Sequence, residues 1–180
     1  YLRVAFANTG CEHEKTLEFV RDCENNWGIP IEWVEYRDDD AGYALVNFET
    51  ASRNGEPFEA IIRKRKYLPN PVTRFCTSEL KIRTMKLWMV ARGYEDWINV
   101  VGLRADEPAR VAKSKNSHER GDVVCPLATA GVTEPDVLEF WSLQPFDLQL
   151  KSYEGNCHLC FLKSASKIYR LIEDHPEKAE

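Results

Sequence analysis

Residues 1–36, YLRVAFANTGCEHEKTLEFVRDCENNWGIPIEWVEY, contain the pattern that decides the fold class. Residues 1–7 form a short apolar run with some alternation and lead into the small polar turn 8–10, as a buried strand does. An apolar stripe with helical spacing follows and stops at Gly28, and residues 29–36 alternate again. This strand–helix–strand order is typical of a parallel α/β sheet.

The remaining chain continues the alternation of helices and strands. Helical patterns cover residues 57–66, 76–92, 134–143 and 161–173, and apolar strand patterns cover 97–103 and 122–127. Thr133 and Asp136 are spaced as the two ends of a capping box. We therefore expect one α/β domain over residues 1–180, with a parallel, Rossmann-like sheet flanked by helices. A loop carrying a cysteine pair and a final helix complete it.

Composition excludes several classes of protein. The chain has 180 residues, enough for a hydrophobic core, with 43% hydrophobic and 29% charged residues, as in ordinary globular proteins. No apolar run approaches the ~20 residues that span a bilayer, and no secretory signal opens the chain. We expect a cytoplasmic protein without membrane contact. The net charge of −5 argues against a protein that coats nucleic acid.

One segment is basic within this acidic chain. Between residues 63 and 92 a single acidic residue, Glu79, faces nine basic ones: Arg63, Lys64, Arg65, Lys66, Arg74, Lys81, Arg83, Lys86 and Arg92. Such a block indicates either an anionic ligand nearby or a solvated helical face.

The cysteines suggest a metal centre. In a reducing compartment the six cysteines serve as thiols or ligands rather than as disulfides. Cys157 and Cys160 form a C-x-x-C pair, which occurs in zinc sites, redox pairs and iron–sulfur sites, or by coincidence. An iron–sulfur cluster needs a third thiolate, for which Cys76 is the candidate. Zinc would need a fourth ligand as well, either Cys125 or His158.

Two turns follow predicted strands and belong at the same edge of a parallel sheet. Residues 8–10 would offer backbone N–H groups to an anion or a base edge, unless they form a plain tight turn. In residues 102–110 (GLRADEPAR), Arg104 and Arg110 could clamp a phosphate or sulfate through bidentate hydrogen bonds. The alternative is a surface loop with Arg–Glu pairs.

Five motifs in this order carry a family resemblance. They are Asn8-Thr9-Gly10-Cys11-Glu12 through Thr16, Cys76-Thr77-Ser78-Glu79-Leu80-Lys81, Gly102 to Arg110, Pro126-Leu127 with Thr133 to Val137, and Gly155-Asn156-Cys157-His158-Leu159-Cys160. Together they resemble the phosphoadenosine phosphosulfate (PAPS) reductase family of the PP-loop, adenine nucleotide alpha-hydrolase-like superfamily. Members reduce sulfonucleotides or cleave the α–β bond of ATP, often for sulfur transfer.

The resemblance implies a site at the carboxyl edge of the sheet. Cys76, Cys157 and Cys160 fall where iron–sulfur members hold a 4Fe-4S cluster. The residues expected near ATP, PAPS or adenosine phosphosulfate (APS) are Asn8, Thr9, Gly10, Glu12, Lys81, Gly102, Arg104 and Arg110. No catalytic residue is identified. Partners would be the adenine nucleotide, a sulfur acceptor such as a nucleic acid, and further copies of the chain in a homo-oligomer.

Four departures from the family pattern shape the alternative. A Ser-Gly-Gly phosphate loop and first strand are expected upstream of Tyr1, Asn8 stands where Asp is usual, and Cys76 is single rather than paired. The chain also lacks a C-terminal Glu-Cys-Gly tail. The last two favour the ATP-using branch, which thiolates or modifies another molecule. The alternative is a loop-less binding or assembly subunit with structural zinc or no metal.

Overall fold

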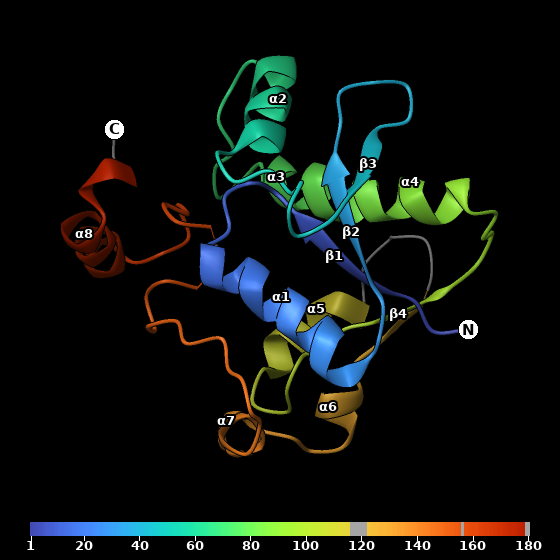
Figure 1. Cartoon of the computed structure of the whole chain (residues 1–180), viewed down its shortest axis with the longest axis vertical. Coiled ribbons are helices and arrows are strands. Elements are labelled where there is room, and N and C mark those ends of the chain that lie inside the picture. The colour runs from blue at the N-terminus through green and yellow to red at the C-terminus, as the bar shows by residue number, and fades with distance from the viewer. Residues whose placement is uncertain (116–121, 156, 179–180) are drawn as a thin grey trace. The chain divides into compact units, whose positions relative to one another are not determined.

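The structure is a computed structural model that describes residues 1–115, 122–155 and 157–178. The chain contains two compact units, one formed by Tyr1–Ala91 with Leu148–Glu180 and the other by Arg92–Asp147. Each unit has a small sheet of its own (Figure 1). The chain is therefore α/β, as predicted. No helix in the described ranges is long and apolar enough to cross a membrane.

The first unit begins with the predicted strand–helix–strand motif. Strand β1 (Val4–Asn8) is followed by helix α1 (Glu14–Trp27) and strand β2 (Ile31–Tyr36), and β1 pairs with β2 in parallel. Gly28 ends α1 with φ +62°, the left-handed conformation that glycine adopts easily. The sequence prediction of this motif is confirmed. Strand β3 (Tyr43–Val46) joins the other edge of β2 and is antiparallel.

Two apolar layers cover the two faces of this sheet. Side chains alternate between faces along a strand, so Trp33 and Tyr36 of β2 point to opposite sides. Trp33 packs in a cluster with Leu17 of α1, and Tyr36 packs with Leu80 on the other face. Helix α1 and the segment around Leu80 therefore sandwich the sheet. Both layers bury their central side chains almost completely.

The second layer of the first unit is built from short helices. Helix α2 (Glu56–Arg65) precedes α3 (Phe75–Thr77), a π-helix (Ser78–Arg83) and α4 (Thr84–Ala91). The prediction of a helix over 76–92 is confirmed in outline, with a π-helical turn inside it. The buried hydroxyl of Thr84 donates a hydrogen bond to the carbonyl of Glu79. In a regular α-helix that carbonyl would accept a backbone N–H instead. The chain returns to this unit with α8 (Ala165–Asp174) and a 3₁₀ turn (Pro176–Lys178).

The second unit contains a two-stranded parallel sheet and three short helices. Strand β4 (Ile98–Val100) pairs with β5 (Asp122–Val124). The helices are α5 (Pro108–Lys115), α6 (Pro126–Thr129) and α7 (Glu134–Ser142). The predicted capping box of α7 is confirmed, since Thr133 and Asp136 bond to each other's backbone in both directions.

Three predicted elements differ from the structure. Residues 108–115 form α5, whereas the sequence predicts a loop over residues 102–110, so Arg110 lies on a helix. The final helix begins at Ala165 rather than at residue 161, because the chain from Cys160 to Lys163 still forms turns after the cysteine pair. The described residues also form two small sheets, of three and two strands, in place of the single parallel sheet that was predicted. Strand β3 runs antiparallel to its neighbour β2.

Candidate functional site

The turn after β1 is held by a buried polar network. The side-chain amide nitrogen of Asn8, Nδ2, donates to Glu35 Oε1 at 2.6 Å and to the carbonyl of Ser52 at 2.8 Å. Glu35 also accepts the N–H and the hydroxyl of Ser52, at 2.6 and 2.8 Å. Both Asn8 and Glu35 are almost fully buried. The network therefore ties the carboxyl ends of β1 and β2 to the loop at Ser52, because an unpaired buried carboxylate would be costly.

Gly10 allows this turn to pass close to another segment. Its φ is +76°, and its carbonyl accepts the N–H of Gly55 at 2.9 Å. A Cβ at this position would lie 3.0 Å from both Gly55 N and the Pro57 ring. Only glycine fits both the backbone conformation and the close approach.

Glu12 closes the turn from the other side. Its carboxylate accepts the N–H of Thr9 at 2.9 Å and the Thr9 hydroxyl at 2.8 Å. The N–H of Gly10 donates to the Asn8 side chain at 3.2 Å. These N–H groups are therefore paired within the turn, as in the alternative of a plain tight turn, and their role toward a ligand stays a prediction. The turn uses them to stabilise itself, and Asn8, Thr9 and Glu12 act first as its framework.

Lys81 links this turn to the segment that carries Cys76. The ammonium of Lys81, on the π-helix, lies 3.4 Å from Glu12 Oε1. The Glu12 side chain is only 7% exposed, so this is a partly desolvated ion pair. Two motifs that lie 69 positions apart in the sequence meet here.

The cysteine-pair loop lies against the same turn. Cys157 Sγ is 3.8 Å from the Thr9 hydroxyl, and the N–H of His158 donates to the carbonyl of Cys11 at 3.3 Å. Burial, followed by the nearby Glu12 carboxylate, raises the pKa of the Cys157 thiol. Lys81 and the Thr9 hydroxyl act in the opposite direction. The thiol at this position is thus protonated at neutral pH.

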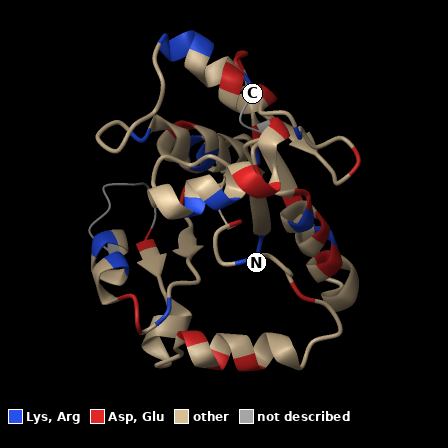
Figure 2. Ribbon diagram, turned by 90° about the vertical axis from the view of Figure 1, so that its left-hand side faces the viewer, with Lys and Arg blue, Asp and Glu red and all other residues tan. Residues whose placement is uncertain are grey.

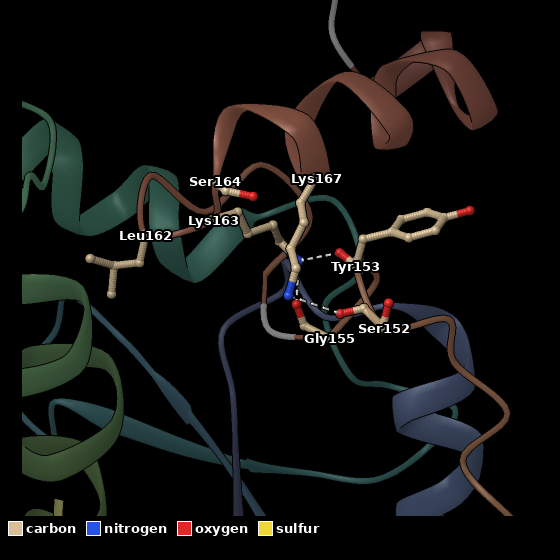
Figure 3. A pocket seen from close by; sticks show the side chains of 7 residues that line it. All are labelled: Ser152, Tyr153, Gly155, Leu162, Lys163, Ser164 and Lys167. Carbon is tan, nitrogen blue, oxygen red and sulfur yellow. Dashed lines mark hydrogen bonds between the residues drawn. The ribbon is translucent and has the colours of Figure 1, made fainter. Parts of the chain in front are cut away.

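Lysine side chains hold the loop that precedes the cysteine pair. Lys163 donates to the carbonyls of Tyr153, at 2.8 Å, and of Gly155, and Lys167 donates to the carbonyl of Ser152 at 3.3 Å. Figure 3 shows both amines directed at the backbone of this loop, where they line a pocket of about 210 Å³. Burial lowers the pKa of Lys163, whereas Cys160 and Cys157 raise it. The net effect is a lowered pKa of Lys163, because burial is the largest cause.

Cys76 occupies a different environment. It lies on α3, half-buried, and packs against the apolar cluster of Tyr36, Ile61, Phe75 and Leu80. Within the described ranges, Cys76, Cys157 and Cys160 are not gathered within the 4.8 Å that the ligand atoms of a single ion would need. Thiolates of a multi-iron cluster bind different irons and lie farther apart. The cluster assignment therefore stays a prediction, as does zinc.

The predicted phosphate residues lie in the second unit. Arg104 Nε donates to Asp106 at 2.9 Å, and its other nitrogens lie 3.9 and 3.7 Å from Glu107 and Glu134. Arg110 forms an ion pair with Glu107 as well. The hydrogen bond from the Arg104 guanidinium lowers the pKa of Asp106. Both arginines are neutralised by carboxylates in this structure, and Gly102 lies at the start of the same loop. Their role toward phosphate stays a prediction.

Neighbouring carboxylates also neutralise much of the basic segment. Figure 2 shows the basic residues of α2 at one end of that helix and its acidic residues at the other. The ion pairs of the segment are Arg63–Glu59, Lys64–Asp38, Arg65–Glu79, Lys81–Glu12 and Arg83–Glu79. Much of the basic segment is therefore a surface of ion pairs.

Sequence reasoning missed Glu35, Ser52 and Lys163. Glu35 left a signal, because a carboxylate near the end of a predicted buried strand must have partners. Ser52 and Lys163 left none, since each bonds to a segment that lies at least 8 positions away in the sequence. Cys125, weighed as a zinc ligand, is buried in the second unit with its sulfur 3.6 Å from the Ser114 hydroxyl.

Comparison with known proteins adds one relative. The chain is 31% identical over 189 residues to the "uncharacterized nin region protein ORF290" of Escherichia phage lambda, an alignment that covers 94% of this chain. The chain spans 59% of the length of that relative. No protein-family model and no solved structure matches the chain.

Proposed function

We propose that this protein is an enzyme of the PAPS reductase type. In this proposal it binds ATP or a sulfonucleotide at the carboxyl end of β1, next to an iron–sulfur cluster held by Cys76, Cys157 and Cys160. One observation carries the proposal: the turn after β1, the cysteine pair and the segment that carries Cys76 meet at Thr9, Cys157 and Lys81. The sequence separates these three motifs widely.

The position of the junction supports a nucleotide site. Ligands of α/β proteins bind in the crevice beyond the carboxyl ends of parallel strands, and β1 and β2 end here in parallel. The buried Asn8–Glu35 bond holds the two strand ends together. The larger Rossmann-like sheet of the family is part of this proposal.

The charges around the thiols support a cluster. Thiolates and a bound cluster carry negative charge, and Lys81, which lies 3.4 Å from Glu12 at the same junction, places a positive charge near Cys157. Partners of this kind stabilise a metal centre and tune its potential. The raised pKa of Cys157 means that cluster assembly releases a proton there.

Among the activities of this type, the single Cys76 favours the branch that uses ATP to transfer sulfur. Sulfonucleotide reductases of the family carry two adjacent cysteines where this chain has Cys76 followed by Thr77. The acceptor in this branch is another molecule, such as a nucleic acid. A cytoplasmic location fits the free state of all six cysteines.

One observation favours a second function, a binding or assembly subunit. The N–H groups of Thr9 and Gly10 and the guanidinium of Arg104 are already paired within the protein. A nucleotide would have to displace these partners. A subunit with structural zinc or no metal at the cysteine pair needs no such rearrangement.

Purification without oxygen, followed by assays of iron, acid-labile sulfide and zinc, tests the proposal. We expect a brown protein with iron and sulfide, and we expect Cys157→Ala and Cys76→Ala each to lose both. Cys23→Ala is the matched control, because Cys23 is a buried packing residue of α1. A colourless protein whose zinc is lost in Cys157→Ala would support the second function. A cluster that survives Cys76→Ala would overturn the three-cysteine assignment.

A further inference from the structure

Three of the four histidines of the chain gather at one place in the first unit. The ring centres of His13 and His158 are 5.3 Å apart, and His175 lies 6.2 Å from the first and 6.1 Å from the second. They come from the start of α1, the cysteine-pair loop and the end of α8. Imidazoles from three separate segments converge beside a carboxylate, that of Glu154.

We propose that His13, Glu154 and His175 form a binding site for a divalent transition-metal ion such as zinc. One ligand atom from each of these residues lies within 4.8 Å of the other two. Donor atoms around a tetrahedral zinc ion lie roughly 3.3–3.6 Å apart. Each pair of ligand atoms therefore needs to close by roughly 1.5 Å at most. Two histidines and one carboxylate are the ligands of many zinc and non-haem iron sites.

Glu154 is oriented for this role. Its side chain is 8% exposed, and its Oε2 accepts the N–H of Lys151 at 2.7 Å. The other oxygen, Oε1, lies 3.9 Å from His175 Nε2. A buried carboxylate with one oxygen fixed by the backbone and the other directed at an imidazole is arranged as a metal ligand with its supporting partner.

His175 is held in place by the end of α8. The backbone N–H of His175 donates to the carbonyl of Leu171 at 2.8 Å. The preceding residue, Asp174, accepts hydrogen bonds from Lys151 at 2.7 Å and from the Tyr153 hydroxyl at 2.6 Å. These bonds fasten the helix end to the turn that carries Glu154. The relative position of two of the three ligands is thus set before an ion binds.

His13 couples the site to helix α1. Its Nδ1 accepts the N–H of Lys15 at 3.1 Å and caps the helix. An accepting nitrogen carries no proton, so the neutral ring holds its proton on Nε2. An ion must either replace the Lys15 N–H at Nδ1 or bind Nε2 after the proton has moved to Nδ1. Either route breaks the cap, and ion binding should therefore change the Lys15 amide.

This site differs from the one proposed for the cysteines. It uses none of Cys76, Cys157 and Cys160, and it does not depend on the proposed nucleotide chemistry. The ring of His158 lies 5.3 Å from that of His13, and in the sequence His158 stands between the two cysteines of the pair. An ion here would join the start of α1, the turn at Glu154 and the end of α8 around the cysteine loop.

Titration of chelator-treated, full-length protein with Zn²⁺ tests the site, followed by NMR of the histidine ring nitrogens and of the backbone amides. We expect one equivalent to shift the rings of His13 and His175 together with the Lys15 amide. Calorimetry should show that Glu154→Gln weakens this event at least about tenfold, the loss caused even by outer-shell changes. His175→Gln should weaken zinc binding in the same way, and it replaces Glu154→Gln in the test if that variant folds poorly.

Glu177→Gln is the matched control. Its carboxylate also faces His175, 3.5 Å from Nδ1, but is exposed and is not needed by the proposed site. The zinc affinity of the Glu177→Gln variant should equal that of the unaltered protein. The double variant Cys157→Ser, Cys160→Ser should still bind zinc at the histidines. Ring signals that do not respond to zinc, or an unchanged affinity in both Glu154→Gln and His175→Gln, would overturn the proposal.

Discussion

The hydroxyl of Thr9 lies 3.8 Å from the sulfur of Cys157, although 148 positions separate the two residues in the sequence. Thr9 belongs to the turn that ends β1, and Cys157 opens the C-x-x-C pair. Because Glu12 binds Thr9 and Lys81 binds Glu12, this contact is part of a continuous polar chain. The candidate site is therefore built on the edge of the first sheet.

Removal of the Thr9 hydroxyl should weaken this chain. Thr9→Val keeps the shape of the side chain and leaves the buried Glu12 carboxylate without one of its donors. We expect a loss of about 1–3 kcal/mol in the free energy of unfolding, measured in urea. Thr50→Val is the control, because the bonds of the Thr50 hydroxyl to described residues all go to nearby, exposed Asn47. An equal loss in both variants would contradict the assigned role of Thr9.

Asn8→Asp should be destabilising, although Asp is usual at this position in the family that the sequence motifs resemble. The new carboxylate would lie about as close to buried Glu35 as the present amide, which is 2.6 Å away. We expect a loss of roughly 2–5 kcal/mol near pH 7, as for other uncompensated buried charges. Glu35→Gln in the same chain should restore part of that loss.

The pH dependence of Asn8→Asp has a definite sign. Two adjacent carboxylates share a proton in the folded state, which raises the pKa of one of them above its unfolded value of about 4. The folded variant then binds more protons than the unfolded chain above that pH. Stability relative to the unaltered protein should fall as the pH rises from about 4 to 7. A deficit that is constant over this range would contradict a close carboxylate pair.

Gly10→Ala tests the close approach to Gly55. The Cβ would face both a left-handed φ and contacts of 3.0 Å with Gly55 N and Pro57. We expect a loss above the roughly 1–2 kcal/mol of left-handed strain alone. Gly28→Ala supplies that reference, since its φ is +62° and no atom lies within 4 Å of its Cβ. Thermal or urea unfolding of the two variants makes the comparison.

The metal-free Cys157 thiol should react slowly with iodoacetamide. Burial and the Glu12 carboxylate raise its pKa, and only the thiolate is a nucleophile. Its alkylation rate, followed by mass spectrometry of peptides, should keep rising with pH beyond the point where the same peptide in urea reaches its plateau. A plateau at the same pH in both states would show that the folded protein does not raise this pKa.

Arg104→Ala tests the predicted phosphate contact. If Arg104 leaves Asp106 to bind a phosphate or sulfate, its loss should weaken nucleotide binding by about 1.5–3 kcal/mol. Isothermal titration with ATP and with PAPS measures this change and identifies the preferred nucleotide. Arg63→Ala is the control, because Arg63 is highly exposed and pairs with Glu59 of its own helix. Unchanged affinity in Arg104→Ala would remove this residue from the site.

Local sequence signals were sufficient for most elements. The alternation of residues 29–36, the stop at Gly28 and the capping box of Thr133 and Asp136 all depend on neighbours a few positions away. The same holds for the start of α2, which is predicted at residue 57 and lies at Glu56. These predictions succeeded because backbone conformation and capping are decided within a turn or two of the chain.

Other features depend on contacts between distant segments. The direction of β3 is set by its pairing with β2, and the pairing of Glu35 with Asn8 and Ser52 requires three separate segments to meet. The occupied N–H groups of Thr9 and Gly10 also follow from the way the turn closes on itself. A charge or a free donor in the sequence does not reveal which partner will satisfy it.

The sequence by itself determined the α/β class, the strand–helix–strand core and the residue types capable of metal or phosphate chemistry. Only the tertiary structure decided which of these residues meet. It placed Cys157 against Thr9, left Cys76 in an apolar cluster, and joined His13, Glu154 and His175, which no sequence motif connects. The physical reason is that periodicity and capping act over a few residues, whereas a binding site is formed by side chains that packing brings together from distant segments.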